Sequence, residues 1–347
     1  MDSLECEREA LLWEALEDEV VRCGLCAHGC RIPAGATGLC GVRENRGGTL
    51  RTLVYGRLVA RNVDPIEKKP LYHVRPGSLS YSIATAGCNF RCAHCQNYEI
   101  SQVQRDAGQI PGRYAAPEAV VAAALEAECG SIAYTYTEPT IYFEYALDCM
   151  RLARKAGLLN VFVTNGYESP GCVEAAVPYL DAANVDLKAM TDEFYRTVCG
   201  ARLEPVLSTI RELWRRGVWV EVTTLVIPHH NDRAEELREI ARFLASVSPD
   251  VPWHVTGFYP TYRLTDESPT PVATLEEARR IGFAEGLRYV YSGNRPGRGG
   301  EDTRCPGCGR RVIGRVGFAV TGMELTPEGR CKGCGQTING LAMGGDT

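Results

Sequence analysis

The stretch Ala86-Gly-Cys-Asn-Phe-Arg-Cys-Ala-His-Cys-Gln-Asn97 directly follows an apolar run, Leu79 to Ala84, that predicts a short strand. It places Cys88, Cys92 and Cys95 in a C-x3-C-x2-C pattern on one tight loop. Three thiolates arranged in this way can hold three corners of an iron–sulfur cube, which normally takes four protein sulfurs. The remaining iron could then bind a small molecule, as the open position of a catalytic zinc site does. The pattern therefore favours a [4Fe–4S] cluster with one open iron over a zinc knuckle that shares a distant fourth Cys.

The composition narrows the class of protein. At 347 residues with 45% hydrophobic content, the chain has room for one large α/β domain and small attachments. A formal net charge of −5 argues against a general nucleic-acid binder, although not against a local RNA-binding patch. No apolar run approaches the roughly 20 residues of a membrane span, and the N-terminus lacks a signal-peptide core. We expect a cytoplasmic protein whose 16 Cys are thiols or metal ligands rather than disulfides.

A second group of Cys lies near the N-terminus, after residues 3–21, which predict an amphipathic helix. It consists of Cys23-Gly-Leu-Cys26-Ala-His-Gly-Cys30 followed by Cys40. Four thiolates separated by glycine and proline cannot form a core of their own, so a metal is the natural organiser. The ligand types allow either a structural Zn²⁺ site or a fully ligated second iron–sulfur cluster, and His28 could replace one Cys in either.

A third group of Cys follows a Gly-Arg-rich boundary at residues 293–300. Cys305-Pro-Gly-Cys308 and Cys331-Lys-Gly-Cys334 form a C-x2-C-x22-C-x2-C pattern, which is typical of a zinc ribbon. A rubredoxin-like iron site would use the same ligands, but abundance and geometry favour Zn²⁺. Because four thiolates leave no open position, the predicted role is scaffolding or partner binding.

Between these groups, strand and helix patterns alternate, which predicts an α/β fold, a partial (β/α)6 TIM-like barrel. The predicted strands are residues 79–84, 131–136, 160–164, 182–187, 218–226 and 253–258, with a late strand at 289–294. Helices are predicted at 118–128, 141–155 and 237–247, and another is capped by Thr274. We divide the chain into an N-terminal helix and Cys-rich metal-binding region (1–75), the barrel (76–298) and the ribbon (299–347).

Polar residues follow three of the predicted strands at the point where each strand ends. They are Glu138, Asn165, and the pair Asp186 and Lys188. The carboxyl ends of parallel strands build the site in such barrels, so we expect these side chains near the cluster. The alternatives are an acid placed near a helix N-terminus for Glu138 and mutual charge balance for Asp186 and Lys188.

A charged segment precedes the strand that leads to the cluster loop. Its residues Lys68, Lys69 and His73 either face the site or belong to a solvated loop. His254, inside a predicted strand, is equally a core histidine or a ligand.

In combination, these motifs resemble the radical S-adenosylmethionine (SAM) superfamily, and within it the radical SAM member of the AmmeMemoRadiSam system. The resemblance spans nearly the whole chain. It rests on the segments Cys23–Cys30, Cys40–Asn45, Asp64–His73, Gly87–Asn97, Tyr134–Thr140 and Asn184–Lys188 and on the terminal ribbon. The chain is more distantly similar to pyruvate formate-lyase activating enzymes. Activases with extra clusters place the added cysteines after the cluster loop, whereas here they precede it.

The resemblance implies roles for individual residues. Thr137 and Glu138 stand in the segment that is Gly-Gly-Glu in relatives and lines the methionine moiety of SAM, although Thr137 replaces a glycine. Asn165 would reach the ribose or carboxylate of SAM. Asp186 would hold a cation or a polar group of SAM. Lys188 would pair with the SAM carboxylate. His94 would pack beside the adenine.

The resemblance also implies a reaction and partners. It implies that a [4Fe–4S] cluster cleaves SAM reductively and that the resulting 5′-deoxyadenosyl radical abstracts hydrogen from a protein or small-molecule substrate, as in an activase. A flavodoxin- or ferredoxin-like electron donor is expected, and the system's name gives MEMO-like and AMMECR-type proteins as candidate partners. Two alternatives remain open, namely a radical SAM enzyme that modifies RNA and a non-catalytic metal-cluster scaffold.

Overall fold

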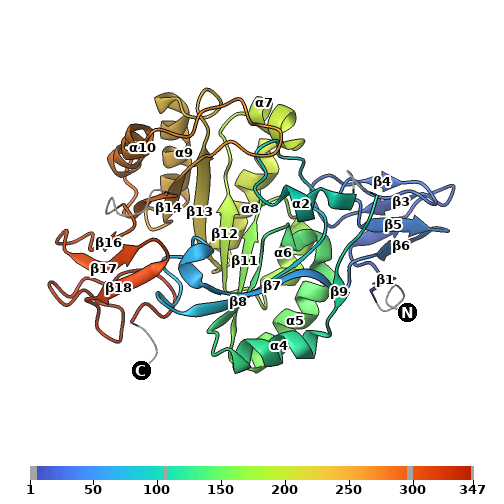
Figure 1. The fold of residues 1–347 in the computed structure, drawn as a ribbon, viewed down its shortest axis with the longest axis horizontal. Helices are drawn as coiled ribbons and strands as arrows, with labels where there is room; N and C mark the ends of the chain where they lie inside the picture. Colours follow the sequence, from blue (N-terminus) through green and yellow to red (C-terminus); the bar gives the residue numbers. More distant parts are fainter. Residues whose placement is uncertain (1–5, 105–107, 295–299, 345–347) are drawn as a thin grey trace.

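The computed structural model describes residues 6–104, 108–294 and 300–344, and in them a nine-stranded sheet forms the centre of the molecule (Figure 1). The strand order is β15-β14-β13-β12-β11-β10-β8-β7-β9. Seven neighbouring strands are parallel: β8 (Leu79–Thr85), β10 (Ser131–Tyr134), β11 (Leu159–Thr164), β12 (Ala182–Asp186), β13 (Trp219–Val226), β14 (Trp253–Gly257) and β15 (Val290–Gly293). The predicted α/β barrel is confirmed, and each predicted strand lies within a few residues of its expected position.

Two antiparallel strands extend the sheet beyond β8. They are β7 (Arg57–Pro65), which pairs with β8, and β9 (Arg113–Tyr114), which pairs with β7. The sheet therefore begins before the predicted start of the barrel at residue 76, and the boundary at 75 stays a prediction.

Helices cover the outer face of the sheet. They are α4 (Pro117–Glu126), α5 (Phe143–Lys155), α6 (Pro170–Ala176), α8 (Leu203–Arg215), α9 (Ala234–Val247) and α10 (Val272–Ala284). Side chains alternate along the strands, so that Ile132 and Tyr134 belong to the core beneath the helices while Ala133 faces the other way. Ser169 caps α6 by accepting a hydrogen bond from the backbone N–H of Cys172 at 3.1 Å.

The charged segment before β8 crosses the inner face of the sheet. After the 3-10 turn η1 (Ile66–Lys68), Leu71 and Val74 pack with Ile66 against small residues of three strands. Those strand residues are Ala133, Val161 and Ala182. Small side chains on the strands leave room for this segment, so it fills part of the barrel interior.

The predicted helix over residues 3–21 is wrong within the described residues, which start at 6. Residues 6–21 instead contribute β1 (Arg8–Glu9), β2 (Trp13–Ala15) and the start of β3 (Val21–Cys23). β2 and β3 form a hairpin, and Leu12, Asp18 and Glu19 have left-handed φ values of 54°, 56° and 57°, which a helix excludes. Pairing with the Cys-rich strands thus overrides the helical pattern of the sequence.

The N-terminal Cys-rich region consists of two small sheets at one end of the molecule. β3 pairs with β2 and β4 (Arg31–Ile32), whereas β6 (Thr49–Thr52) pairs with β1 and β5 (Arg43–Arg46). Leu25, Ile32 and Val42 belong to the same hydrophobic core as the barrel. The region is therefore continuous with the barrel.

The ribbon is a three-stranded antiparallel sheet at the opposite end of the long axis (Figure 1). Its strands are β16 (Thr303–Arg304), β17 (Arg311–Val316) and β18 (Ala319–Met323). It has a separate hydrophobic cluster, which includes Tyr72, Tyr289 and Tyr291 of the barrel side. In the part of the chain described here, no helix has the length and apolar character needed to cross a membrane.

Candidate active site

One large cavity opens at the carboxyl ends of the parallel strands. Its empty space, including the part open to solvent, is about 1650 Å³. All nine residues predicted for this site line it: Cys88, Cys92, Cys95, His94, Thr137, Glu138, Asn165, Asp186 and Lys188. Their individual roles stay predictions, but the strand ends bring them together as a parallel sheet should.

The loop that carries the three thiols is held by backbone hydrogen bonds. Gly87 has a φ of +105°, and a Cβ there would lie 2.9 Å from a methyl group of Val42, so only glycine fits the start of the loop. The backbone N–H groups of Arg91 and Ala93 donate to residues 199 and 198, at 2.8 and 3.0 Å. The loop therefore has a fixed course over the cavity.

Two of the three thiols have polar neighbours of their own. The Sγ of Cys88 accepts a hydrogen bond from the backbone N–H of Phe90 at 3.4 Å, and the Sγ of Cys95 lies 3.2 Å from the Oγ of Ser101. N–H and O–H donors of this kind stabilise cluster sulfurs and set their potential.

A fourth thiol, Cys199, which lies outside the three Cys groups of the sequence, is next to the second loop thiol. Cys199 ends the π-helix η3 (Tyr195–Cys199) and shares a side-chain hydrogen bond with Cys92, which lowers the pKa of Cys92. Cys199 is fully buried and does not belong to the cavity lining. The cavity is therefore lined by the three loop thiols and not by Cys199.

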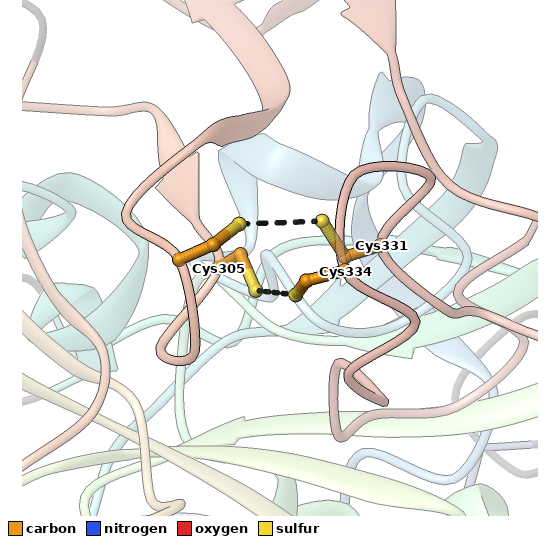
Figure 2. A group of neighbouring side chains, drawn as sticks. Cys305, Cys331 and Cys334 are labelled. Atoms are coloured by element: carbon orange, nitrogen blue, oxygen red, sulfur yellow. Dashed lines mark hydrogen bonds between the residues drawn. The ribbon is translucent and has the colours of Figure 1, made fainter.

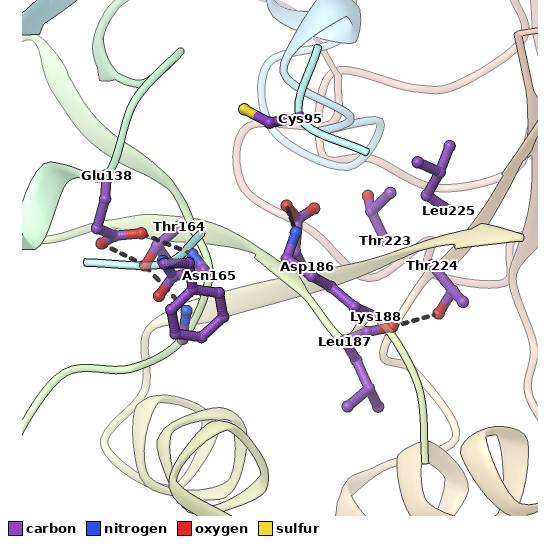
Figure 3. Close-up of polar contacts among 12 residues, drawn as sticks. Cys95, Glu138, Thr164, Asn165, Asp186, Leu187, Lys188, Thr223, Thr224 and Leu225 are labelled. Carbon is purple, nitrogen blue, oxygen red and sulfur yellow. Dashed lines mark hydrogen bonds and ion pairs between the residues drawn. The ribbon is translucent and has the colours of Figure 1, made fainter. Parts of the chain in front are cut away.

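Glu138 connects two strand ends (Figure 3). Its carboxylate accepts hydrogen bonds from the backbone N–H of Asn165 at 2.8 Å and from the hydroxyl of Thr164 at 2.9 Å. It also caps the turn η2 (Pro139–Tyr142) by accepting from the backbone N–H of Thr140. Burial raises the pKa of Glu138, while these hydrogen bonds oppose that shift. The carboxylate thus positions the cavity wall formed by β10 and β11.

Glu168 is a second buried carboxyl group that the sequence did not reveal. Its Oε1 lies 2.7 Å from the hydroxyl of Thr164, which also contacts Glu138. Burial and the nearby Glu138 raise the pKa of Glu168. Since one hydroxyl can donate to only one of them, a protonated Glu168 that donates to Thr164 satisfies the arrangement.

Asp186 and Lys188 form an ion pair of 2.8 Å at the end of β12, below Cys95 (Figure 3). Burial alone would lower the pKa of Lys188, but Asp186 and Cys92 raise it well above its usual value. The side chain is therefore a fixed positive charge in the cavity.

His94 and Thr137 complete the wall. Burial lowers the pKa of His94 to about 3, which keeps the imidazole neutral, and its Nδ1 is buried without a hydrogen-bond partner. The Thr137 hydroxyl donates to the carbonyl of Thr85 at 2.9 Å. An orphaned buried ring nitrogen beside three thiols is a feature that a polar ligand would satisfy.

The charged segment before β8 also reaches this cavity. Lys68 and Lys69 line it, and Lys69 pairs with Asp64 at 2.6 Å. Burial lowers the pKa of Lys69 to about 8, against the influence of Asp64. His73 does not line the cavity and contacts the ribbon side instead, so the prediction that it might face the site is wrong for His73.

His254 is a core histidine. Its Nε2 lies 2.7 Å from the Glu221 carboxylate, and both residues are buried. Glu221 also accepts the backbone N–H groups of Tyr72 and His73 at 3.0 and 2.7 Å. This network fixes the segment that crosses the barrel.

The ribbon thiols form a compact four-Cys group (Figure 2). The Sγ atoms of Cys305 and Cys334 are 3.5 Å apart, and those of Cys308 and Cys331 are 3.8 Å apart. The two knuckles repeat each other, since Gly309 and Gly335 each donate from N–H to the carbonyl of the first Cys of their pair, at 2.8 Å. This group could hold one metal ion.

Comparison with known proteins identifies the fold and its relatives. The family model described as the Radical SAM superfamily matches residues 82–244. The uncharacterized protein MJ0808 of Methanocaldococcus jannaschii is 46% identical over 96% of this chain and 99% of its own length. SuiB of Streptococcus suis has a similar fold, with a TM-score of 0.50 and 13% identity over 65% of this chain and 52% of that chain.

Two curated relatives are activating enzymes. The isethionate sulfite-lyase activating enzyme of Oleidesulfovibrio alaskensis is 29% identical over 43% of this chain, which spans half of that enzyme. The pyruvate formate-lyase 1-activating enzyme of Escherichia coli is 22% identical over 59% of this chain and 89% of that enzyme. The three-thiol loop lies at the strand ends, the family model matches this part of the chain, and the relatives include activating enzymes. The chain therefore belongs to the radical SAM superfamily.

Proposed function

We propose that this chain is an activase-like radical SAM enzyme in which Cys88, Cys92 and Cys95 hold a [4Fe–4S] cluster and the surrounding strand ends hold SAM. The observation that supports it most directly is the gathering of all nine predicted residues around one cavity. The donor set fits the group, because three thiols line the cavity and the buried Cys199 stands outside it. When bound, the reduced cluster and SAM supply one-electron cleavage to methionine and a 5′-deoxyadenosyl radical, which takes hydrogen from the substrate.

The chain's own residues would orient SAM and exclude water. Lys188 offers a permanent positive charge to the SAM carboxylate, and Asp186 keeps that charge in place. Neutral His94 offers its unpartnered Nδ1 near the thiols. Glu138 uses its oxygens to hold the ends of β10 and β11, so its contribution to SAM binding is positioning.

The substrate class, electron donor and ribbon metal belong to the same proposal. The size of the cavity leaves space beyond a bound SAM for a substrate side chain or small molecule. We infer a low-potential flavodoxin- or ferredoxin-like donor and Zn²⁺ in the ribbon, whose sulfur separations match the roughly 3.8 Å of a tetrahedral site with Zn–S bonds of about 2.3 Å. We also propose MEMO-like and AMMECR-type proteins as partners, on the basis of the family resemblance alone.

The test is anaerobic reconstitution with iron and sulfide, followed by dithionite and SAM. We expect 5′-deoxyadenosine from the wild type and none from the Cys88→Ala/Cys92→Ala/Cys95→Ala variant. Cys129→Ala serves as the matched control, because Cys129 is buried just before β10, at the end of the strand opposite the cavity, and does not line it; the variant should leave the product yield unchanged. A wild type that carries its iron but yields no 5′-deoxyadenosine would overturn the proposed function in favour of a metal scaffold.

Lys188→Met tests the SAM site more finely. Loss of a charged hydrogen bond should weaken SAM binding by roughly 10- to 100-fold. Calorimetry on the iron-loaded protein measures this directly, and the iron content should not change. Unaltered SAM affinity would remove Lys188 from the site.

A further inference from the structure

The four N-terminal thiols surround a small cavity of their own. Cys23, Cys26, Cys30 and Cys40 all line it, and its empty space, including its opening, is about 330 Å³. Cys23 and Cys40 are buried, while Cys26 and Cys30 are partly exposed. Four thiols that line one cavity are a ligand set of the kind that a Zn²⁺ ion or an iron–sulfur cluster takes.

The spacing of these thiols differs from that of the ribbon. Among the described residues, the ribbon thiols form the one group of three or more Cys, His, Asp or Glu side chains whose ligand atoms all lie within 4.8 Å of one another. No three of the N-terminal thiols therefore meet that limit. A single Zn²⁺ with Zn–S bonds of about 2.3 Å needs sulfurs about 3.8 Å apart, so these thiols are too widely spread for it.

The thiols of the SAM-site loop provide a second standard within the same chain. Cys88, Cys92 and Cys95 line a cavity and likewise do not form a group within 4.8 Å. An iron–sulfur cube holds its ligands on separate corners, so it needs thiols that are farther apart than a single ion does. The N-terminal thiols resemble the loop thiols in this respect and differ from the ribbon.

A buried cation adjoins the N-terminal cavity. Arg43 is 1% exposed, lines the cavity and donates from Nη1 to the Sγ of Cys23 at 3.4 Å. Its Nη2 is held by Glu144 at 2.6 Å and by the carbonyl of Leu11 at 2.7 Å. Because Glu144 holds the guanidinium in place, Arg43 offers a fixed N–H donor to the sulfur of Cys23, and donors of this kind tune thiolate-bound clusters.

The two Cys sites are neighbours. Asn89 lines the N-terminal cavity, while the preceding residue, Cys88, lines the SAM cavity. The Nε2 of His28, between the second and third N-terminal thiols, lies 2.9 Å from the Asn89 carbonyl. Cys26 also forms a backbone bridge with Glu168, next to the strand end that carries Asn165. The two cavities are therefore lined by adjacent residues of one loop.

We propose that Cys23, Cys26, Cys30 and Cys40 bind a second [4Fe–4S] cluster that passes single electrons to the cluster at Cys88, Cys92 and Cys95. In each transfer the N-terminal cluster is oxidised from the 1+ to the 2+ state and the SAM-site cluster is reduced from 2+ to 1+. A low-potential ferredoxin- or flavodoxin-class protein supplies the electron. The transfer rests on the proposed function, whereas occupancy of the N-terminal site does not.

The deciding measurement leaves the N-terminal thiols intact. The Cys88→Ala/Cys92→Ala/Cys95→Ala variant is reconstituted anaerobically with ferrous iron and sulfide in the presence of zinc, and its metals are counted. We expect about four iron and four sulfide ions per chain, together with about one zinc in the ribbon. About two zinc ions without iron, or one zinc and an empty N-terminal site, would overturn the proposal.

Electron paramagnetic resonance tests the proximity of the two clusters. The reduced wild type should give a spectrum broadened by spin–spin coupling, unlike the sum of spectra from the triple variant and from a Cys26→Ala/Cys30→Ala variant. Cys129→Ala should retain the wild-type spectrum. Two uncoupled signals would contradict electron transfer between adjacent sites, and circular dichroism verifies that each variant is folded. Because neither readout requires SAM cleavage, failure here is distinguishable from failure of the proposed function.

Discussion

The ribbon and the N-terminal Cys region each carry four thiols, yet they are attached to the barrel in different ways. The ribbon thiols are compact, and Cys305 and Cys331 belong to a separate hydrophobic cluster. Cys23 and Cys40 belong instead to the main core that runs beneath the barrel helices. The same four-thiol pattern thus occurs in a peripheral module in one place and in a region that shares the barrel core in the other.

This difference indicates different consequences of metal loss. A compact four-thiolate site organises its own knuckles, so its loss should unfold the ribbon locally. The N-terminal site abuts the loop of Cys88 through Asn89 and His28, so its loss should reach the SAM cavity. The predictions below test this contrast in order of expected effect.

The largest effect is expected for Cys26→Ala compared with Cys308→Ala, a ribbon ligand. With a reduced flavodoxin as donor, Cys26→Ala should lower 5′-deoxyadenosine formation by about 100-fold, because the electron path is interrupted. Cys308→Ala should remain close to the wild-type rate. Initial rates measure both, and equal losses in the two variants would erase the contrast.

Arg43→Met should cost about 3–5 kcal/mol of unfolding free energy. The change leaves Glu144 as a buried charge without its partner, since the Arg43–Glu144 pair is 1% and 6% exposed. The matched control is Arg46→Met, whose side chain is 44% exposed in its pairs with Glu7 and Glu44 and should contribute at most about 1 kcal/mol. Urea denaturation of the metal-loaded proteins gives both values. A cost at Arg43 no larger than at Arg46 would show that the region is not tied to the core.

The sequence predicted the parallel strands well because each is a buried apolar run between turn signals, as Val161 and Val222 illustrate. It predicted the grouping of Glu138, Asn165 and Lys188 because strand ends of a parallel sheet share one edge. It could not predict the position of Cys199, which depends on how η3 returns to the cluster loop. The prediction of an N-terminal helix was wrong because apolar residues at helical spacing can also be buried by short strands when a neighbouring strand provides backbone partners, as β3 does for β2.

The distances between thiols in space likewise could not be predicted from the sequence. C-x2-C occurs both at Cys23 with Cys26 and at Cys305 with Cys308, but only the second pair continues into two matching knuckles. Ligand type and local spacing predict metal binding, whereas the distance between the Cys pairs is set by the tertiary structure. Evidence that separates a single metal ion from an iron–sulfur cluster therefore comes only from the structure, which shows how far apart the Cys pairs lie.

The smallest effect concerns the attachment of the ribbon at low pH. His73 is fully buried between the Asn339 carbonyl and the Tyr291 hydroxyl, each 2.6 Å from a ring nitrogen. The carbonyl can only accept, so Nδ1 carries the proton and Nε2 accepts from Tyr291. Burial lowers the pKa of His73 to about 4. Between that value and about 6.5 the unfolded chain binds the extra proton, so stability rises with pH across this window and is lost on acidification.

We therefore expect the unfolding free energy of the wild type to contain a contribution of up to about 3 kcal/mol that disappears as the pH falls from 6.5 to 4. His73→Gln should lack that part of the slope, and comparison at each pH cancels the common effect of acid on the thiolates. His229→Gln, at an exposed loop position, should keep the wild-type slope. Parallel slopes for wild type and His73→Gln would mean that the His73 side chain does not couple the ribbon to the barrel. The attachment would then depend on contacts such as the buried Arg315–Glu67 pair at 3.4 Å and the hydrogen bond from Arg315 to the Tyr72 carbonyl at 2.7 Å, neither of which titrates between pH 4 and 6.5 through an imidazole.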